Sequence, residues 1–287
     1  KKKDVNQEGG QGTRQVGFTG PNVSDKPSWS PFFVYIAILL LAFSLFFPSL
    51  YRESQRIIDL AGVEDLSAFM ASLLTVIQPF FLAVLALLAG HFFTYRLGLG
   101  SVVYDYFDSQ KVAKAKLKVS LQPALALGLL YGLMIASFDL IFRPWLPDIV
   151  SQGLQAPSLI DLVGSIFYSG VVEEVMLRFG LMTLFLYIIS FQARRVTKGR
   201  VIFTIVFQTV LFMLAYLPNV TTYLDLTPVV VIRLFVFVGL SNLLFSYLYY
   251  RYHIEAAMIS HMTSVLVSGL LAVSYTHLRA HETREDL

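Results

Sequence analysis

Seven apolar runs, each long enough to cross a lipid bilayer, constrain this chain more than any other feature of its sequence. A transmembrane helix needs about 20 predominantly apolar residues. The chain is also 56% hydrophobic and only 14% charged, which is too apolar for an ordinary soluble domain. We therefore expect an all-α fold, a polytopic bundle of about seven transmembrane helices. The expected spans are Pro31–Leu50, Ala68–Leu97, Val119–Phe142, Ser158–Ser190, Val201–Leu217, Thr227–Tyr250 and Ile254–Val273.

The basic residues indicate how this bundle is oriented. Most Lys and Arg residues outside the apolar runs lie in the N-terminal segment and in the second, fourth and sixth loops, whereas few lie in the alternate loops. The positive-inside rule then places the N-terminus in the cytoplasm. We expect an integral protein of a bacterial plasma membrane, in contact with the lipid bilayer. The net charge of only +3 implies no nucleic-acid partner.

The chain divides into four segments by composition. Residues 1–28 are polar and Gly-rich, which predicts a disordered cytoplasmic tail. Residues 29–157 contain the first transmembrane helices, and residues 158–273 contain the transmembrane core with the charged motif described below. Residues 274–287 differ abruptly in composition from the run before them, like a translated vector sequence, and we expect a non-native tail there. The native chain would then have room for an eighth span; an ordinary polar tail is the alternative.

Three ionisable residues lie inside the fourth apolar run. A charge near the centre of a bilayer costs about 2.5–3.5 kcal/mol on insertion scales, so these residues need a reason to be there. Glu174 and Arg178 are four residues apart and share one helix face, which predicts an ion pair. Glu173 lies about 100° around the helix from Glu174, so its side chain does not face Arg178. The pattern predicts a structural pair and a free acid. The alternative is an ion pair that only orients the bundle, with Glu173 in a polar gap.

Two further polar residues lie in later runs. His261 is about two turns into the last run, and an intramembrane histidine is a functional candidate by default, although a histidine satisfied within the core is the alternative. Tyr216 shares a face with Phe212, and Pro218 is expected to end that helix. From the residues alone, Tyr216 is an interfacial anchor. At 1.5 Å per residue, His261 and Tyr216 lie about 10 Å and about 24 Å from the inner ends of their helices, so they meet only if helices tilt or boundaries shift.

The order and spacing of these residues resemble those of the CAAX protease and bacteriocin-processing family of intramembrane proteases (CPBP, or Abi), which includes CAAX prenyl protease 2. The resemblance covers roughly residues 159–271. The family motifs are EExxxR, then FxxxH, then HxxxN or HxxxD, on successive membrane helices. The first motif is intact here as Glu173, Glu174 and Arg178.

The second and third motifs depart from the family pattern. Tyr216 stands where the second motif has histidine. The third motif begins with His261 but has Val265 where the family has Asn or Asp. A tyrosine hydroxyl can still donate one hydrogen bond, whereas the side chain of valine can donate none.

The resemblance implies an intramembrane endopeptidase with a modified active site. Its substrate would be a peptide, a lipidated substrate or a membrane protein. Glu173 would activate a water molecule as general base, and His261 and Tyr216 would stabilise the oxyanion. Glu174 and Arg178 would hold the helix and tune Glu173.

The sequence does not determine whether the protein uses a metal cofactor. Some descriptions of the family call its members metalloproteases, and a zinc site usually takes three protein ligands. The replaced histidine and amide leave that ligand set incomplete, so the cofactor is none or unknown. Glu173, Glu174 and His261 could bind a metal only if both carboxylates turned inward. The chain contains no cysteine, which excludes a thiolate metal site and a cysteine nucleophile.

Two other functions are compatible with the sequence. The first is a catalytically impaired relative that binds a membrane partner or gives self-immunity to a bacteriocin. The second is a transporter in which Glu173, Arg178 and His261 line a substrate or proton path. The transporter is disfavoured because the sequence contains no evident internal repeat or pair of broken helices.

Overall fold

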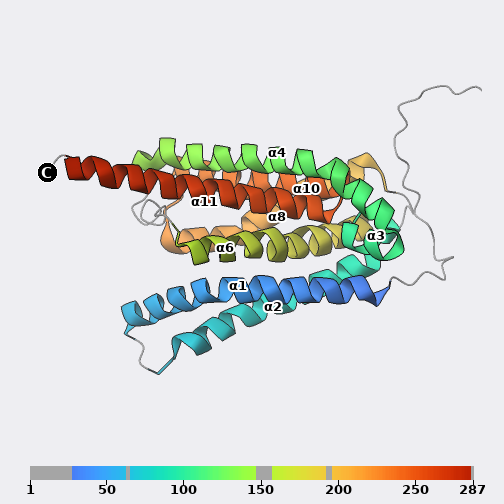
Figure 1. Cartoon of the computed structure of the whole chain (residues 1–287), viewed down its shortest axis with the longest axis horizontal. Helices are drawn as coiled ribbons and strands as arrows, with labels where there is room; N and C mark the ends of the chain where they lie inside the picture. Colours follow the sequence, from blue (N-terminus) through green and yellow to red (C-terminus); the bar gives the residue numbers. More distant parts are fainter. Residues whose placement is uncertain (1–27, 63–64, 147–156, 192–195, 286–287) are drawn as a thin grey trace, which may run out of the picture.

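The computed structural model describes residues 28–62, 65–146, 157–191 and 196–285. Within these ranges every regular element is a helix, and seven helical segments are long and apolar enough to cross a membrane. The predicted all-α bundle with seven spans is therefore confirmed (Figure 1). The predicted disordered tail lies outside the described residues, apart from Ser28. The spans are Trp29–Asp59, Ala68–Phe93, Gln110–Trp145, Leu159–Phe191, Lys198–Pro218, Pro228–Arg251 and Ile254–Ser274.

The first three spans are long helices, and short elements join the second to the third at one end of the bundle (Figure 1). The elements of this part are α1 (Trp29–Ala61), α2 (Ala68–Phe93), η1 (Tyr95–Leu97), α3 (Val102–Asp108), α4 (Gln110–Phe142) and η2 (Arg143–Trp145). Elements η1 and η2 are single 3-10 turns.

The remaining spans include three stretches of π-helix. The fourth span consists of α6 (Leu159–Phe167), the π-helices η3 (Tyr168–Glu173) and η4 (Val175–Met182), and α7 (Thr183–Phe191). The fifth is α8 (Lys198–Tyr223), and the sixth consists of α9 (Pro228–Leu234), the π-helix η5 (Phe235–Leu240) and α10 (Ser241–Arg251). The last span lies in α11 (Ile254–Glu285).

Hydroxyl side chains mark where several of these helices begin. The side-chain oxygens of Ser67, Thr197 and Thr227 each accept a hydrogen bond from the backbone N–H three residues further on. This arrangement satisfies one of the first N–H groups of a helix, which have no partner within the helix itself. Pro228 follows Thr227 as the first residue of α9, a position where its missing N–H costs nothing.

The expectation that Pro218 ends its helix is wrong, because α8 continues past it to Tyr223. Proline removes one backbone hydrogen bond, but transmembrane helices tolerate it where neighbouring hydroxyl groups compensate. Here the hydroxyl of Thr221 donates to the carbonyl oxygens of Leu217 and Pro218, at 3.1 and 3.2 Å. The proline therefore lies within the last turns of α8.

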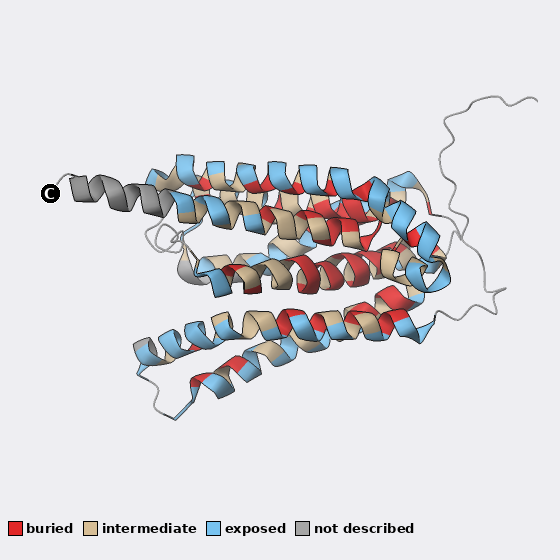
Figure 2. Cartoon of the chain, in the orientation of Figure 1, coloured by how far each residue is buried: buried red, intermediate tan, exposed pale blue. Residues whose placement is uncertain are grey.

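The fourth span is the central helix of the bundle. In the most apolar stretch of Leu159–Phe191, 50% of the residues are buried inside the protein. The corresponding share in the other spans is 17–33%. Figure 2 shows this burial as an almost continuous red stretch through the middle of the span, whereas the outward faces of its neighbours are exposed. Exposed apolar side chains on those faces are expected where the surrounding medium is lipid. The charged motif therefore lies at the centre of the bundle.

Helices α4 and α11 pack side by side along much of their length (Figure 1). Two glycines of α4 allow this close approach. A Cβ atom at Gly128 would lie 2.4 Å from the carbonyl oxygen of Ser260, and one at Gly132 would lie 2.7 Å from that of Ser264. Small residues four positions apart commonly allow membrane helices to approach this closely. The contact places α4 against the turn of α11 that contains His261.

Candidate active site

The predicted ion pair is present at the centre of the bundle. Arg178 Nη1 donates to Glu174 Oε1 at 3.0 Å, and the two side chains are 2% and 0% exposed. Arg178 Nη2 also donates to the carbonyl oxygen of Ser241, at the start of α10, at 3.3 Å. The pair therefore joins the fourth span to the sixth, as expected of a pair that orients helices.

His261 lies between the two adjacent carboxylates. Its Nδ1 is 2.7 Å from Glu174 Oε1, and its Nε2 is 4.0 Å from Glu173 Oε2. The side chain of Glu173 is 39% exposed, whereas that of His261 is 12% exposed and that of Glu174 is fully buried. Glu173 is thus the member of the group that solvent or a substrate reaches most easily, and no arginine of the described ranges forms an ion pair with it.

Helix geometry explains how both glutamates reach one imidazole. The segments on either side of Glu174 are π-helical, so a turn contains more residues than the 3.6 of an α-helix. The 100° rotation per residue that separates neighbouring side chains in an α-helix does not apply here. Single turns of π-helix occur frequently at functional sites, and in this chain they coincide with the EExxxR motif.

One oxygen of Glu174 makes both contacts of this carboxylate. Oε1 accepts from Arg178 and faces His261 Nδ1, whereas Glu174 Oε2 and Arg178 Nε have no hydrogen-bond partner among the described residues. The pair is therefore not bidentate, although Arg–carboxylate pairs frequently are. As a result, His261 supplies half of the hydrogen bonding to the buried carboxylate.

Neither Tyr216 nor Val265 makes a side-chain hydrogen bond to this group within the described part of the chain. Tyr216 is 41% exposed on α8, and its ring centroid is 6.4 Å from that of Phe212. No hydrogen bond or ring contact joins Tyr216 to Glu173 or His261 within the described part of the chain. Val265 lies one turn beyond His261 on α11. The structure thus brings together Glu173, Glu174, Arg178 and His261, and Tyr216 stays a predicted donor.

The described residues do not form a metal site. No group of three His, Asp or Glu side chains in the described ranges is arranged to hold a metal ion. Glu174 Oε1 already accepts from Arg178 and contacts His261. Because these residues do not fit a three-ligand site, we derive no step through a metal.

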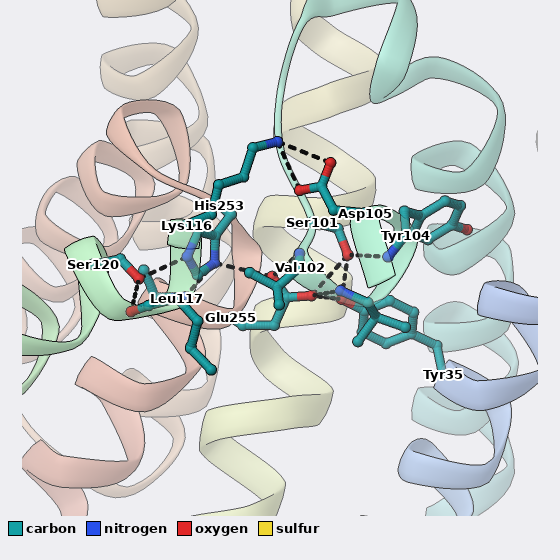
Figure 3. A network of polar contacts seen from close by, with 12 residues as sticks. Tyr35, Ser101, Val102, Tyr104, Asp105, Lys116, Leu117, Ser120, His253 and Glu255 are labelled. Atoms are coloured by element: carbon teal, nitrogen blue, oxygen red, sulfur yellow. Dashed lines mark hydrogen bonds and ion pairs between the residues drawn. The ribbon is translucent and has the colours of Figure 1, made fainter. Parts of the chain in front are cut away.

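The sequence interpretation missed Glu255, a part-buried carboxylate in the first turn of α11 whose side chain is 15% exposed. Figure 3 shows this carboxylate surrounded by donors from distant parts of the chain. It accepts hydrogen bonds from the hydroxyls of Tyr35 and Ser101, both at 2.7 Å, and from the backbone N–H groups of Val102 and Val103, at 2.8 and 2.9 Å. These contacts fix the start of α11 relative to α1 and α3. They thereby also fix the position of His261 along the bundle axis.

His253 extends this network. Its Nδ1 is 3.0 Å from Glu255 Oε2, and its Nε2 is 2.7 Å from the hydroxyl of Ser120 on α4 (Figure 3). The order Ser–His–Glu matches that of a serine hydrolase, but Ser120 is 0% and His253 1% exposed. The hydroxyl of Ser120 also donates to the carbonyl oxygen of Leu117. These contacts indicate a structural network.

A cavity of about 660 Å³ lies at the same end of the bundle, and Ser101, Tyr104 and Lys116 are among its lining residues. Burial is the largest cause that raises the pKa of the Tyr104 phenol, and the negative charge of Glu255 adds to it. The hydroxyl of Tyr104 therefore stays protonated at neutral pH. Glu173 and His261 are not among the lining residues, so this cavity is separate from the candidate active site.

Comparisons with known proteins agree with the motif resemblance. Comparison with curated proteins and with solved structures gives no match. Residues 155–267, which contain all of the candidate site residues, match the family model described as "Type II CAAX prenyl endopeptidase Rce1-like". Within this segment the chain is therefore similar to the Rce1-like family of CAAX prenyl endopeptidases.

Proposed function

We propose that the protein is a membrane-embedded peptidase that hydrolyses a peptide bond of a lipidated or membrane-bound substrate. The main support is the position of the partly exposed Glu173 beside the His261 imidazole, inside a transmembrane helix. The family match of the same segment adds to this support. On the basis of the basic loops, we also propose an N-terminus in the cytoplasm of a bacterial cell.

Glu173 is the proposed general base because it is the accessible carboxylate. Its side chain is 39% exposed, and it makes no hydrogen bond to Arg178. Glu173 would accept a proton from a water molecule as the water oxygen bonds to the carbonyl carbon of the substrate. The C–N bond then breaks, and the leaving nitrogen takes the proton from Glu173. The products are a carboxyl group and an amine.

His261 is the proposed donor to the oxyanion. Glu174 can accept the Nδ1 proton of His261 in either charge state, which leaves Nε2 directed toward Glu173. While Nδ1 carries the proton donated to Glu174, only the doubly protonated ring also presents an Nε2–H donor. A donor already in place stabilises the developing negative charge without reorganisation during the reaction.

Tyr216 is proposed as a second donor because it occupies the histidine position of the second family motif. Its exposure of 41% leaves the side chain accessible. Because Tyr216 makes no hydrogen bond to Glu173 or His261, this role requires the substrate, or a movement of α8, to bring Tyr216 to the reacting carbonyl group.

The test is cleavage of a farnesylated peptide ending in C-a-a-X by the purified protein in lipid nanodiscs. Glu173→Gln should abolish turnover, because the amide cannot accept the proton. Glu53→Gln, a change at an exposed glutamate of α1, is the matched control and should leave turnover unchanged. Cleavage that persists in Glu173→Gln would overturn the proposed base.

A second candidate is a non-catalytic relative that binds a membrane partner. The observation that favours it is the absence, among the described residues, of a hydrogen bond between Tyr216 and His261, together with valine at position 265. The double substitution Tyr216→His with Val265→Asn restores the family pattern and should raise peptidase activity or create it. If both the native protein and this variant are inert, and Glu173→Gln retains the cellular phenotype, the binding function is the better account.

A further inference from the structure

The aromatic ring of Phe245 contacts both partners of the Glu174 carboxylate. It stacks on the imidazole of His261 with ring centroids 4.4 Å apart and an interplanar angle of 25°. The guanidinium carbon of Arg178 lies 5.5 Å from the centroid of the same ring. Phe245 itself is 0% exposed. A single phenyl ring on α10 thus packs against the two side chains that hold the buried carboxylate.

Tyr131, on α4, holds Phe245 and the segment before it. Its ring meets that of Phe245 edge to face, with centroids 5.6 Å apart and an interplanar angle of 86°. Its hydroxyl lies 3.1 Å from the carbonyl oxygen of Val236 and 2.9 Å from that of Phe237, both in η5. Because η5 leads directly into α10, these contacts fix the start of the helix that presents Phe245.

Tyr131 itself has little room to move. It lies between Gly128 and Gly132, whose Cα atoms approach the carbonyl oxygens of Ser260 and Ser264. Those two residues lie on either side of His261 along α11. Movement of the Tyr131 backbone away from Phe245 would therefore require α4 to separate from the turn of α11 that contains the histidine.

The imidazole needs this support because one hydrogen bond does not fix its orientation. The hydrogen bond that Nδ1 donates to Glu174 Oε1 leaves the ring free to tilt about that contact, and a tilt moves Nε2 away from Glu173. A ring stacked on one imidazole face blocks the tilt, since interior side chains pack without free space. Catalytic groups need this order of precision, because a misplacement of about 1 Å costs about 100-fold in rate.

We propose that Phe245 and Tyr131 are positioning residues of the candidate active site. The Phe245 ring sets the plane of the His261 imidazole so that Nδ1 faces Glu174 and Nε2 faces Glu173. Tyr131 acts through Phe245, by its edge-on contact and by its hydrogen bonding to η5. The consequence for catalysis rests on the proposed function, whereas the positioning of the imidazole does not.

The test is nuclear magnetic resonance of the full chain with labelled histidine rings, in nanodiscs. The His261 signals are assigned by their loss in His261→Gln. Phe245→Leu should shift the His261 ring protons downfield, because the shielding by the stacked phenyl ring is lost, and should change the ratio of the two neutral tautomers. Tyr131→Phe keeps the edge-on ring and removes only the hydroxyl, so it should produce a smaller shift in the same direction.

Phe138→Leu is the matched control. Phe138 stacks on Phe142 with the same centroid distance of 4.4 Å and an angle of 27°, further along α4 and outside the candidate site. This change should leave the His261 signals in place. Unchanged His261 signals in Phe245→Leu, or an equal change in Phe138→Leu, would overturn the positioning role.

Measurements of peptidase activity distinguish a failure of the positioning role from a failure of the proposed function. With a cleavable C-a-a-X peptide, Phe245→Leu should lower kcat on the order of 10- to 100-fold and leave KM unchanged, because only the geometry of the reacting groups is altered. If the native protein is active and Phe245→Leu lowers kcat no more than Phe138→Leu does, the inference fails and the function stands. If the His261 signals shift as expected but the native protein cleaves nothing, the positioning role stands and the peptidase function fails.

Discussion

Replacing Arg178 with leucine tests the charge balance in the bilayer interior. The guanidinium is 2% exposed and donates to Glu174 and to the Ser241 carbonyl oxygen. Removing one partner of a buried pair leaves the other charge uncompensated and costs about 3–5 kcal/mol. His261 Nδ1 still lies 2.7 Å from Glu174 Oε1, so one partner of the carboxylate remains. We therefore expect a loss at the lower end of that range, about 3 kcal/mol.

A loss of about 3 kcal/mol changes the unfolding equilibrium constant by about 150-fold. The assay is reversible unfolding of the purified protein in mixed micelles, followed by circular dichroism. Glu173→Gln is the control one residue away from the pair. It should change the free energy of unfolding by about 0.5 kcal/mol or less, because Glu173 is 39% exposed and its contact with His261 Nε2 is as long as 4.0 Å.

A double substitution identifies the source of the loss. Arg178→Leu combined with Glu174→Leu removes both charges, and replacing a buried pair by apolar residues is often neutral or stabilising. The double variant should therefore be more stable than Arg178→Leu alone. If it is not, the loss comes from packing against Phe245 and not from an uncompensated charge. Equal losses in Arg178→Leu and Glu173→Gln would refute the division between a structural pair and a free acid.

Three further outcomes are expected. Gly132→Leu should separate α4 from α11, because its Cβ would lie 2.7 Å from a backbone oxygen, and should lower the unfolding midpoint. Glu255→Gln should cost about 1.5–3 kcal/mol in the same unfolding assay, because hydrogen bonds to a charged acceptor are lost. Single cysteines at Lys114 and Lys198 should react with an impermeant thiol reagent only from the cytoplasmic side, and one at Asp225 only from the outside; reaction of Asp225→Cys from the cytoplasm would reverse the orientation.

Most of the fold could be predicted from the sequence, because lipid leaves few structures available to an apolar chain. Each long apolar run became one span, since the backbone must satisfy its hydrogen bonds within the helix. The pair of Glu174 and Arg178 followed from a spacing of four residues. That spacing still brings the two side chains together through the π-helical segment.

The contacts that complete the site could not be predicted in this way. His261 is 87 residues from Glu174, and Tyr35 is 220 residues from Glu255, so no local pattern pairs them. The π-helices depend on packing around the motif and not on a distinct composition. Pro218 is a local signal that tertiary context overrides, because the hydroxyl of Thr221 lies within reach of the neighbouring carbonyl groups.

The Glu255 network gives the bundle one rigid end. Buried residues near it include Tyr35, Tyr249 and Ile254, whereas Tyr51 and Leu270, toward the opposite end, are 41% and 51% exposed. Local opening in proteins begins where few contacts resist it. The helices should therefore begin to separate at the end of the bundle farther from Glu255 and stay packed at the end near it. Amide hydrogens of α11 should then exchange progressively faster with distance along the helix from Glu255.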